Sequence, residues 1–324
     1  MKAIQTISKI ISKYLPLWIV LLSIIAYVIP DTFISIRQLT GFGLGTIFFL
    51  MGLSLSSEKL LEVIKNPKHA LLGVFLKWTI MVGVSIGVAY LFFSNQAEIA
   101  TGIILAGTVP SGTSANIYTF IAGGEVALSI TMATLDTFIS PVLTPVLLQT
   151  FAGRFIPIEF WPLFLNIIYI VFFPLVAGLL IQWKFQRQVE KVKPYTSVLS
   201  QLALFLVILS VISNAQQALS ENLSVLPLVF VAVTLQVSIP MGAGYFISRW
   251  LGVPERNARA ILFHTGICNT ALAATLAMEH FGSLAAVPAV ANMVMNLTIG
   301  ALMASLFENK FRLDNEEVQM VSEG

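Results

Sequence analysis

Two polar interruptions of apolar sequence carry the residues best suited to bind a solute or an ion. The first, at 107–116, contains Pro110 and Gly112, and a helix cannot continue unbroken through that pair. The second, at 264–270, interrupts an apolar segment in the other half of the chain. Broken backbone at membrane depth persists only where it is buried in protein or lines a watery cavity, where its freed N–H and C=O groups can hold a ligand. The candidate ligand-binding residues are Thr108, Ser111, Gly112, Thr113, Asn116, Asn269 and Thr270, with Asn292 and Asn296 near the end of the chain.

Ionisable side chains within apolar segments form a second candidate set. An isolated charge at bilayer depth is costly, so Lys77 and Asp136 are each expected to have a partner. Asp136 is the only acidic residue in the interior of a predicted span rather than at its ends, and its spacing from Ser129 places both on one helix face. We therefore predict that Asp136 is the counter-charge of Lys77 or His264. The candidate residues for ion or proton coupling are Lys77, Asp136, His264, Ser129, Asn116 and Cys268.

These residues also have purely structural interpretations. Lys77 could extend its ammonium to the membrane surface, Asp136 could belong to a polar pair that only fixes packing, and a neutral His264 could bond a carbonyl. Cys268 could be a small apolar filler. The functional interpretation is favoured for the charged residues because charges within a membrane span usually mark ion or solute pathways.

The composition requires lipid as the solvent of most of the chain. Of its 324 residues, 57% are hydrophobic and only 10% are charged, with a mean hydropathy of +0.88. Soluble domains contain about 25% charged residues. The sequence has no phosphate-binding loop and no spacing of metal ligands, which argues against ATP hydrolysis and metal-dependent catalysis.

Ten apolar segments are long enough to be predicted as membrane spans. The basic N-terminus leads straight into the first, which predicts a retained cytoplasmic start rather than a signal peptide. With both termini placed on the cytoplasmic side, only Arg37 and Arg154 fall in outer loops, and Lys77 lies within a span. The other 15 of the 18 Lys and Arg residues lie on the cytoplasmic side. This bias predicts a cell inner-membrane protein with both termini cytoplasmic. The spans are 15–29, 39–55, 69–93, 97–122, 125–150, 161–183, 196–218, 225–248, 256–279 and 285–307, the fourth and ninth being broken.

The spans divide into two halves of five. We predict a first five-helix repeat over 1–155, a second over 156–310, and a disordered acidic cytoplasmic tail over 311–324. Because five is an odd number, the second half enters the membrane in the opposite orientation, which makes the repeats inverted.

Several runs resemble those of the bile acid:sodium symporter family. The most specific is 110–116, followed by similar runs at 119–129 and 140–145, and 266–274 resembles the family's second signature. The resemblance covers nearly the whole chain. It implies an all-α polytopic membrane protein with ten transmembrane helices in two inverted five-helix repeats, in which two discontinuous helices cross in a core domain beside a panel domain. Members of this family carry bile acids or other small organic anions, usually with sodium.

The chain departs from this family at the positions that bind sodium there. Lys77 stands where the family supplies an amide ligand, and His264 stands where it has an acidic residue. Sodium prefers oxygen ligands, and two like charges about 4 Å apart repel by roughly 4 kcal/mol at an effective dielectric of about 20. Cys268, Ala115 and Ala133 also differ from the family, whereas Asn116, Ser129 and Asn269 are retained.

The resemblance and its departures predict a secondary active transporter of a small organic anion that works by alternating access. Its sodium dependence is weakened or lost, Lys77 replaces a sodium ion, and transport is proton-coupled or facilitated. The alternative is a sodium:organic anion symporter with one weak, rearranged sodium site at Asn116, Ser129 and Asp136. A membrane receptor or an intramembrane enzyme is disfavoured by the lack of a signalling domain or a nucleophile–base pair.

No cofactor is predicted beyond Na⁺ or H⁺ as the coupling ion. The expected partners are the organic anion and the lipid bilayer, and no nucleic acid. The identity of the anion, the coupling stoichiometry, the direction of transport and the oligomeric state stay open.

Overall fold

The computed structural model describes residue 11 and residues 14–54 and 67–323, and in these segments the structure is helical with no named strand. Seven helical segments among the described residues are long and apolar enough to cross a membrane. They are Ile34–Ser54, Pro67–Phe93, Val126–Ala152, Phe160–Lys184, Tyr195–Glu221, Leu223–Trp250 and Ser283–Glu308. Two shorter apolar helices, Leu17–Val28 and Ala97–Thr108, accompany them. The basic residues predicted to mark the cytoplasmic start, Lys2, Lys9 and Lys13, lie outside the described residues.

The order of helices follows the predicted segments closely. The first half contains α2 (Leu15–Val28), the short helices η1 (Pro30–Thr32) and η2 (Ile34–Leu39), α3 (Thr40–Ser54), α5 (Pro67–Leu76), the π-helical turn η3 (Lys77–Met81), α6 (Val82–Phe93), α7 (Ala97–Thr108), α8 (Ser114–Ile121) and α9 (Val126–Ala152). The second half contains α10 (Phe160–Ile167), the π-helical turn η4 (Ile168–Phe172), α11 (Phe173–Lys184), α12 (Gln186–Glu221), η5 (Leu223–Val225), α13 (Leu226–Trp250), α14 (Glu255–Gly266), α15 (Thr270–His280) and α16 (Ser283–Glu323). Both predicted breaks are found, between α7 and α8 and between α14 and α15.

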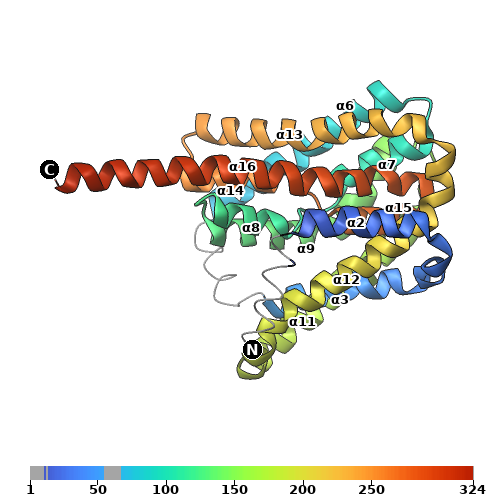
Figure 1. Ribbon diagram of the computed structural model, residues 1–324, viewed down its shortest axis with the longest axis horizontal. Helices are drawn as coiled ribbons and strands as arrows, with labels where there is room; N and C mark the ends of the chain where they lie inside the picture. Colours follow the sequence, from blue (N-terminus) through green and yellow to red (C-terminus); the bar gives the residue numbers. More distant parts are fainter. Residues whose placement is uncertain (1–10, 12–13, 55–66, 324) are drawn as a thin grey trace.

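The helices pack in two layers. One, which we call the panel layer, contains η2 and α2, α3, α10, α11 and α12, and the other, the crossover layer, contains α5 to α9 and α13 to α16. The most extensive helix contacts, such as α3 with α11 and α13 with α14, lie within one layer. In Figure 1, α3, α11 and α12 run together through the lower part of the view, and α13, α14 and α16 occupy the upper part.

Two glycines allow α3 and α11 to approach each other backbone to backbone. A Cβ atom added to Gly52 would clash with the carbonyl oxygen of Leu175, and one added to Gly178 would clash with that of Phe49. Small residues favour such contacts in lipid, where helix association depends on van der Waals packing. This contact therefore stabilises the panel layer.

We expect Gly178→Val to push α3 and α11 apart and to lower stability by about 1–3 kcal/mol, the usual cost of overpacking. The measurement is the apparent melting temperature of the detergent-solubilised protein, in which about 1 kcal/mol shifts the midpoint by roughly 2–4 °C. Gly87→Val is the matched control, because a Cβ there meets nothing within 4 Å. Equal losses in the two variants would contradict the role given to this contact.

Hydroxyl side chains repair the proline-containing part of α9. Pro141 has no N–H, so the carbonyl of Thr137 loses its helical donor, and the Ser140 hydroxyl donates to that carbonyl at 3.0 Å. The Thr144 hydroxyl donates to the carbonyl of Thr108 at the end of α7. These bonds keep α9 continuous where it packs against the first break. They also fix the position of the helical turn that precedes Ser140.

The end of the chain differs from its prediction. The sequence predicts a disordered tail over 311–324, whereas α16 continues as a helix to Glu323. No proline or glycine lies between Gly300 and Gly324, so the sequence carries no helix-ending signal there. Figure 1 shows this end of α16 projecting beyond the other helices.

Candidate functional site

The two helix breaks cross and pair with each other. The N–H of Gly112 donates to the carbonyl of Ile267 at 3.1 Å, and the N–H of Asn269 donates to the carbonyl of Pro110 at 2.8 Å. Ser111 and Cys268 thereby form an isolated antiparallel bridge. A side chain at Gly112 would press on the Cys268 carbonyl, so glycine is needed for this close approach. The pairing satisfies backbone groups that the breaks would otherwise leave buried without partners.

The N-termini of α8 and α15, the helices that follow the two breaks, lie at the crossing. Asn269 caps α15, because its Oδ1 accepts the N–H of Leu272 at 3.1 Å. Asn116, in the first turn of α8, accepts the Ser129 hydroxyl on its Oδ1 at 2.7 Å. Thr113 is exposed at the start of α8, and Thr270 is buried at the start of α15. Helix N-termini carry partial positive charge and unpaired N–H groups, so this region suits an anion.

Lys77 points from the crossover layer into the first break. It is 1% exposed and begins the π-helical turn η3. Its Nζ donates to the carbonyl of Val109 at 2.6 Å, a group that the break at Pro110 leaves without a helical donor. The same Nζ lies 3.8 Å from Oδ2 of Asp136. The ammonium therefore lies at the break and does not extend toward the membrane surface as the purely structural interpretation requires.

Asp136 is completely buried and is contacted on both oxygens. Its Oδ1 accepts the indole N–H of Trp78 at 2.7 Å, and its Oδ2 accepts the backbone N–H of Ser111 at 3.1 Å. Oδ2 also lies 3.3 Å from Nε2 of His264 and 3.8 Å from the Lys77 ammonium. Both partners predicted for Asp136 therefore lie against it, and the first break is tied to α9 through Ser111.

His264 is completely buried in the last turn of α14. Its Nε2 is close to Asp136, but the geometry is not that of a hydrogen bond, and neither ring nitrogen has such a partner among the described residues. An unpaired imidazole beside a buried carboxylate is a costly arrangement to keep for packing alone. It leaves a position that a proton or a ligand group can use.

Trp78 belongs to this cluster, although the sequence did not single it out. Its indole N–H binds Asp136, and the Lys77 ammonium lies 3.3 Å from the centroid of its ring. The π-helical turn explains the arrangement: consecutive side chains diverge by a smaller angle in a π-helix than in an α-helix, so both can meet one carboxylate. The only sequence signal was the tryptophan next to an intramembrane lysine.

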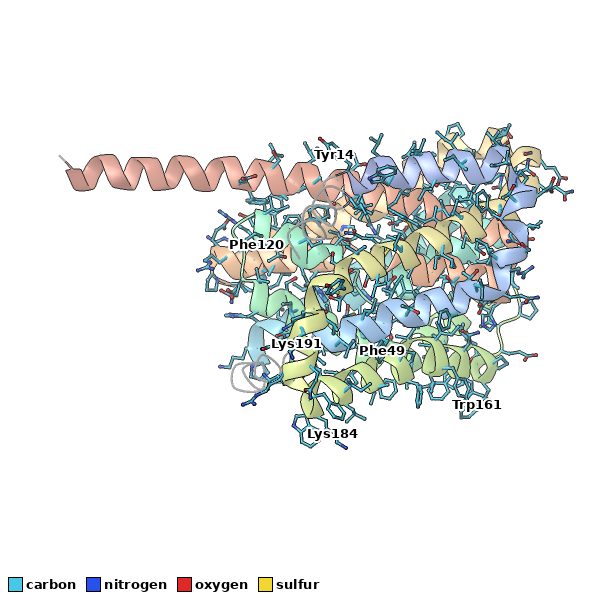
Figure 2. All side chains as sticks on the ribbon, turned by 60° about the horizontal axis from the view of Figure 1, so that its bottom comes forward. Tyr14, Phe49, Phe120, Trp161, Lys184 and Lys191 are labelled. Atoms are coloured by element: carbon cyan, nitrogen blue, oxygen red, sulfur yellow. The ribbon has the colours of Figure 1, made fainter. Side chains whose placement is uncertain are left out.

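We expect Trp78→Phe to leave Oδ1 of Asp136 without its donor and to destabilise the protein by about 1–3 kcal/mol. The apparent melting temperature in detergent would fall by several degrees. Trp161→Phe is the control, because Trp161 is 66% exposed on α10. Figure 2 shows Trp161 at the edge of the molecule. A Trp78→Phe variant as stable as this control would contradict the importance of the indole bond.

A second buried polar network adjoins the other break. Gln236 of α13 donates to the Ser85 hydroxyl and to the carbonyl of Ile103, both at 2.7 Å, and accepts the Asn292 amide at 2.7 Å. Asn296 donates to the carbonyl of Cys268 at 3.0 Å, while its Oδ1 has no partner among the described residues. Asn292 and Asn296 therefore lie at the second break, and Gln236 is a further buried member that sequence reasoning missed.

The predicted sodium ligands are only partly brought together. Asn116 and Ser129 are hydrogen-bonded, but no hydrogen bond or ion pair in the described part of the chain joins either to Asp136. Thr108 turns its hydroxyl back to the carbonyl of Leu105 in its own helix. The Ser111 hydroxyl is buried and has no partner among the described residues.

A multi-pass helical protein with two crossing broken helices and buried ionisable groups is typical of secondary transporters. Residues 13–309 match the SBF-like CPA transporter family (DUF4137), and the chain belongs to this family. It is 32% identical over 313 residues, 96% of either chain, to an uncharacterized sodium-dependent transporter, YocS, of Bacillus subtilis (strain 168). It is 29% identical over 307 residues to BASS1 of Arabidopsis thaliana, a probable chloroplastic sodium/metabolite cotransporter, covering 94% of this chain and 75% of that one.

A probable chloroplastic sodium/metabolite cotransporter of Oryza sativa subsp. japonica, BASS2, is 28% identical over 310 residues, covering 94% of this chain and 73% of the relative. These findings confirm the family resemblance that the motifs indicated. The chain is a multi-pass membrane transporter and not an enzyme.

Proposed function

We propose that this protein carries a small organic anion by alternating access and that Lys77 takes the place of a coupling sodium ion. One observation carries the proposal: the buried Lys77 ammonium donates to the Val109 carbonyl and lies 3.8 Å from Asp136. It thus uses the freed carbonyl and the carboxylate that would attract a mobile cation. A sodium ion entering here would meet a like charge instead of a complete set of oxygen ligands. If sodium does not bind here, transport is either coupled to protons or facilitated without a coupling ion.

The proposed architecture has ten transmembrane helices in two inverted repeats, 1–155 and 156–310. The α7–α8 and α14–α15 pairs, each broken near its middle, are the fourth and ninth spans, and α2 is the first. These three spans bring the total to ten when added to the seven helical segments that are each long and apolar enough to cross a membrane. The Lys and Arg distribution supports an inner-membrane location with both termini cytoplasmic.

We place the anion's carboxylate between the N-termini of α8 and α15. The partial positive charge of both helix ends favours an anion. The unpaired Ser111 hydroxyl and Asn296 Oδ1 flank the crossing and supply further polar groups. The remaining proposed contacts are Thr108, Gly112, Thr113, Asn116, Asn269, Thr270 and Asn292.

The test is uptake into proteoliposomes of radiolabelled pantoate, pyruvate and taurocholate, with an imposed sodium gradient, pH gradient or neither. We expect at least one of these acids to enter faster than into protein-free liposomes, and a sodium gradient to add little. Uptake driven strongly by sodium alone would contradict the replacement by Lys77. Binding of an acid without any uptake would favour a receptor.

The second candidate is a sodium:organic anion symporter with one rearranged sodium site at Asn116, Ser129 and Asp136. The names of the relatives favour it, since they include sodium, and so does the Asn116–Ser129 hydrogen bond. The filled oxygens of Asp136 argue against it. Sodium-specific thermal stabilisation of the purified protein separates the two candidates, because only a protein that binds sodium gains stability from it.

A further inference from the structure

Side-chain hydrogen bonds join the panel layer to the crossover layer at the C-terminal end of α15. Asn166 of α10 donates its amide to Oε2 of Glu279 at 2.9 Å. Arg37 of η2 donates to the carbonyl of Met278 at 3.4 Å. A Cβ atom placed on Gly41, at the start of α3, would lie 3.7 Å from Oε1 of the same Glu279. Three panel elements therefore converge on one helix end.

The chemistry of this helix end suits a reversible contact. The last carbonyls of a helix lack intrahelical donors, and its C-terminus carries partial negative charge, so the Arg37 guanidinium is a favourable partner for Met278. The Asn166–Glu279 bond is exposed. Water can therefore replace the Asn166 amide on the Glu279 carboxylate when the contact opens.

The opposite end of the layers is arranged differently. Phe120 and Ile117 of α8 are 73% and 52% exposed, so the panel layer does not cover them. Figure 1 shows α3 and α12 approaching α15 at one end of the molecule and diverging from α8 and α14 at the other. Figure 2 likewise shows Phe120 apart from Phe49 of α3 and Lys191 of α12.

We propose that Arg37, Asn166 and Glu279 form a latch that closes the two layers at the Glu279 end in the conformation described here. The latch opens when the crossing becomes accessible from that side, and it sets the balance between the two accessible states. This inference rests on the proposed alternating access, in which one layer moves against the other around the crossing. Weakening the latch therefore shifts the population toward the state that is open at the Glu279 end.

The experiment measures the separation of the layers without any substrate. Nitroxide labels on Asp31→Cys, beside the panel layer, and Asn95→Cys, beside the crossover layer, report this end of the molecule; both positions are exposed, and the native Cys268 is buried. Pulsed electron–electron double resonance in lipid nanodiscs gives the distance distribution. We expect one main population with the latch intact and a second, several ångström longer, in Glu279→Ala and in Arg37→Ala with Asn166→Ala.

The matched control is Glu159→Gln, which changes charge at an exposed position preceding α10 at the same end. It should leave the distribution unchanged. A distribution unaffected by Glu279→Ala, by the Arg37–Asn166 double variant and by the control alike would overturn the latch. This result is distinct from failure of the proposed transport, which would show as no anion uptake while the label distances still respond to Glu279→Ala. If the double variant does not fold, Glu279→Ala alone decides, since it removes an exposed carboxylate.

Discussion

Replacing Asp136 by Asn is expected to destabilise this protein by about 3–5 kcal/mol, the usual result of removing one partner from a buried ion pair. The Lys77 side chain is 1% exposed, and in this variant a neutral amide would replace the carboxylate that now balances the charge of its ammonium. At roughly 2–4 °C per kcal/mol, the apparent melting temperature in detergent would fall by roughly 6–20 °C. Lys77→Met should cause a comparable loss by leaving Asp136 without its ammonium.

The double variant Lys77→Met with Asp136→Asn tests whether the two residues stabilise the protein as a pair. Replacement of a whole buried ion pair by neutral groups is often nearly neutral, so the two losses should be far from additive. The exposed pair of Arg256 and Glu125, 3.7 Å apart, provides the matched control, and Glu125→Gln should cost less than about 1 kcal/mol. Losses that simply add in the double variant would show that Lys77 and Asp136 do not act as a pair.

The breaks and the buried charges could be predicted from the sequence because each violates a strong local rule. Pro110 and Gly112 cannot continue a helix, and a lysine and an aspartate in apolar spans require partners. The 3.8 Å approach of Lys77 to Asp136 and the crossing of the two breaks agree with those rules. Their physical basis, backbone satisfaction and charge burial, is independent of the detailed packing.

Trp78 and Gln236 could not be predicted because their roles depend on local geometry. On a regular α-helix Lys77 and Trp78 would point about 100° apart, and the π-helical turn η3, in which both contact Asp136, brings their directions closer together. Gln236 is one buried amide in a long apolar helix, and its three partners come from three other helices. Whether Asp136 shares a site with Asn116 depends on hydrogen-bond directions that the sequence does not encode, since the Asp136 oxygens accept from Trp78 and Ser111 and Asn116 accepts from Ser129.

Lys77→Gln together with His264→Glu is expected to make this protein sodium-responsive. The first change removes the ammonium and leaves the Val109 carbonyl without its 2.6 Å donor, while adding an amide oxygen. The second adds a carboxylate on the side of the Asp136 oxygen that His264 Nε2 now faces at 3.3 Å. Oxygen ligands and negative charge are what a hard cation requires. The same cluster would thereby change from a site with a fixed cation to one that needs a mobile cation.

The expected measurement is a sodium-specific rise in apparent melting temperature. At sodium about 100-fold above its dissociation constant, binding adds about 2.7 kcal/mol, or roughly 5–10 °C, and potassium or choline at equal ionic strength should add little. Lys191→Gln, which removes one positive charge at an exposed position on α12, is the control. If the unmodified protein already gained the same stabilisation from sodium, the fixed-cation proposal would be wrong, because an ion site would coexist with Lys77. A response confined to the double variant would show that the ammonium and the imidazole are what exclude sodium.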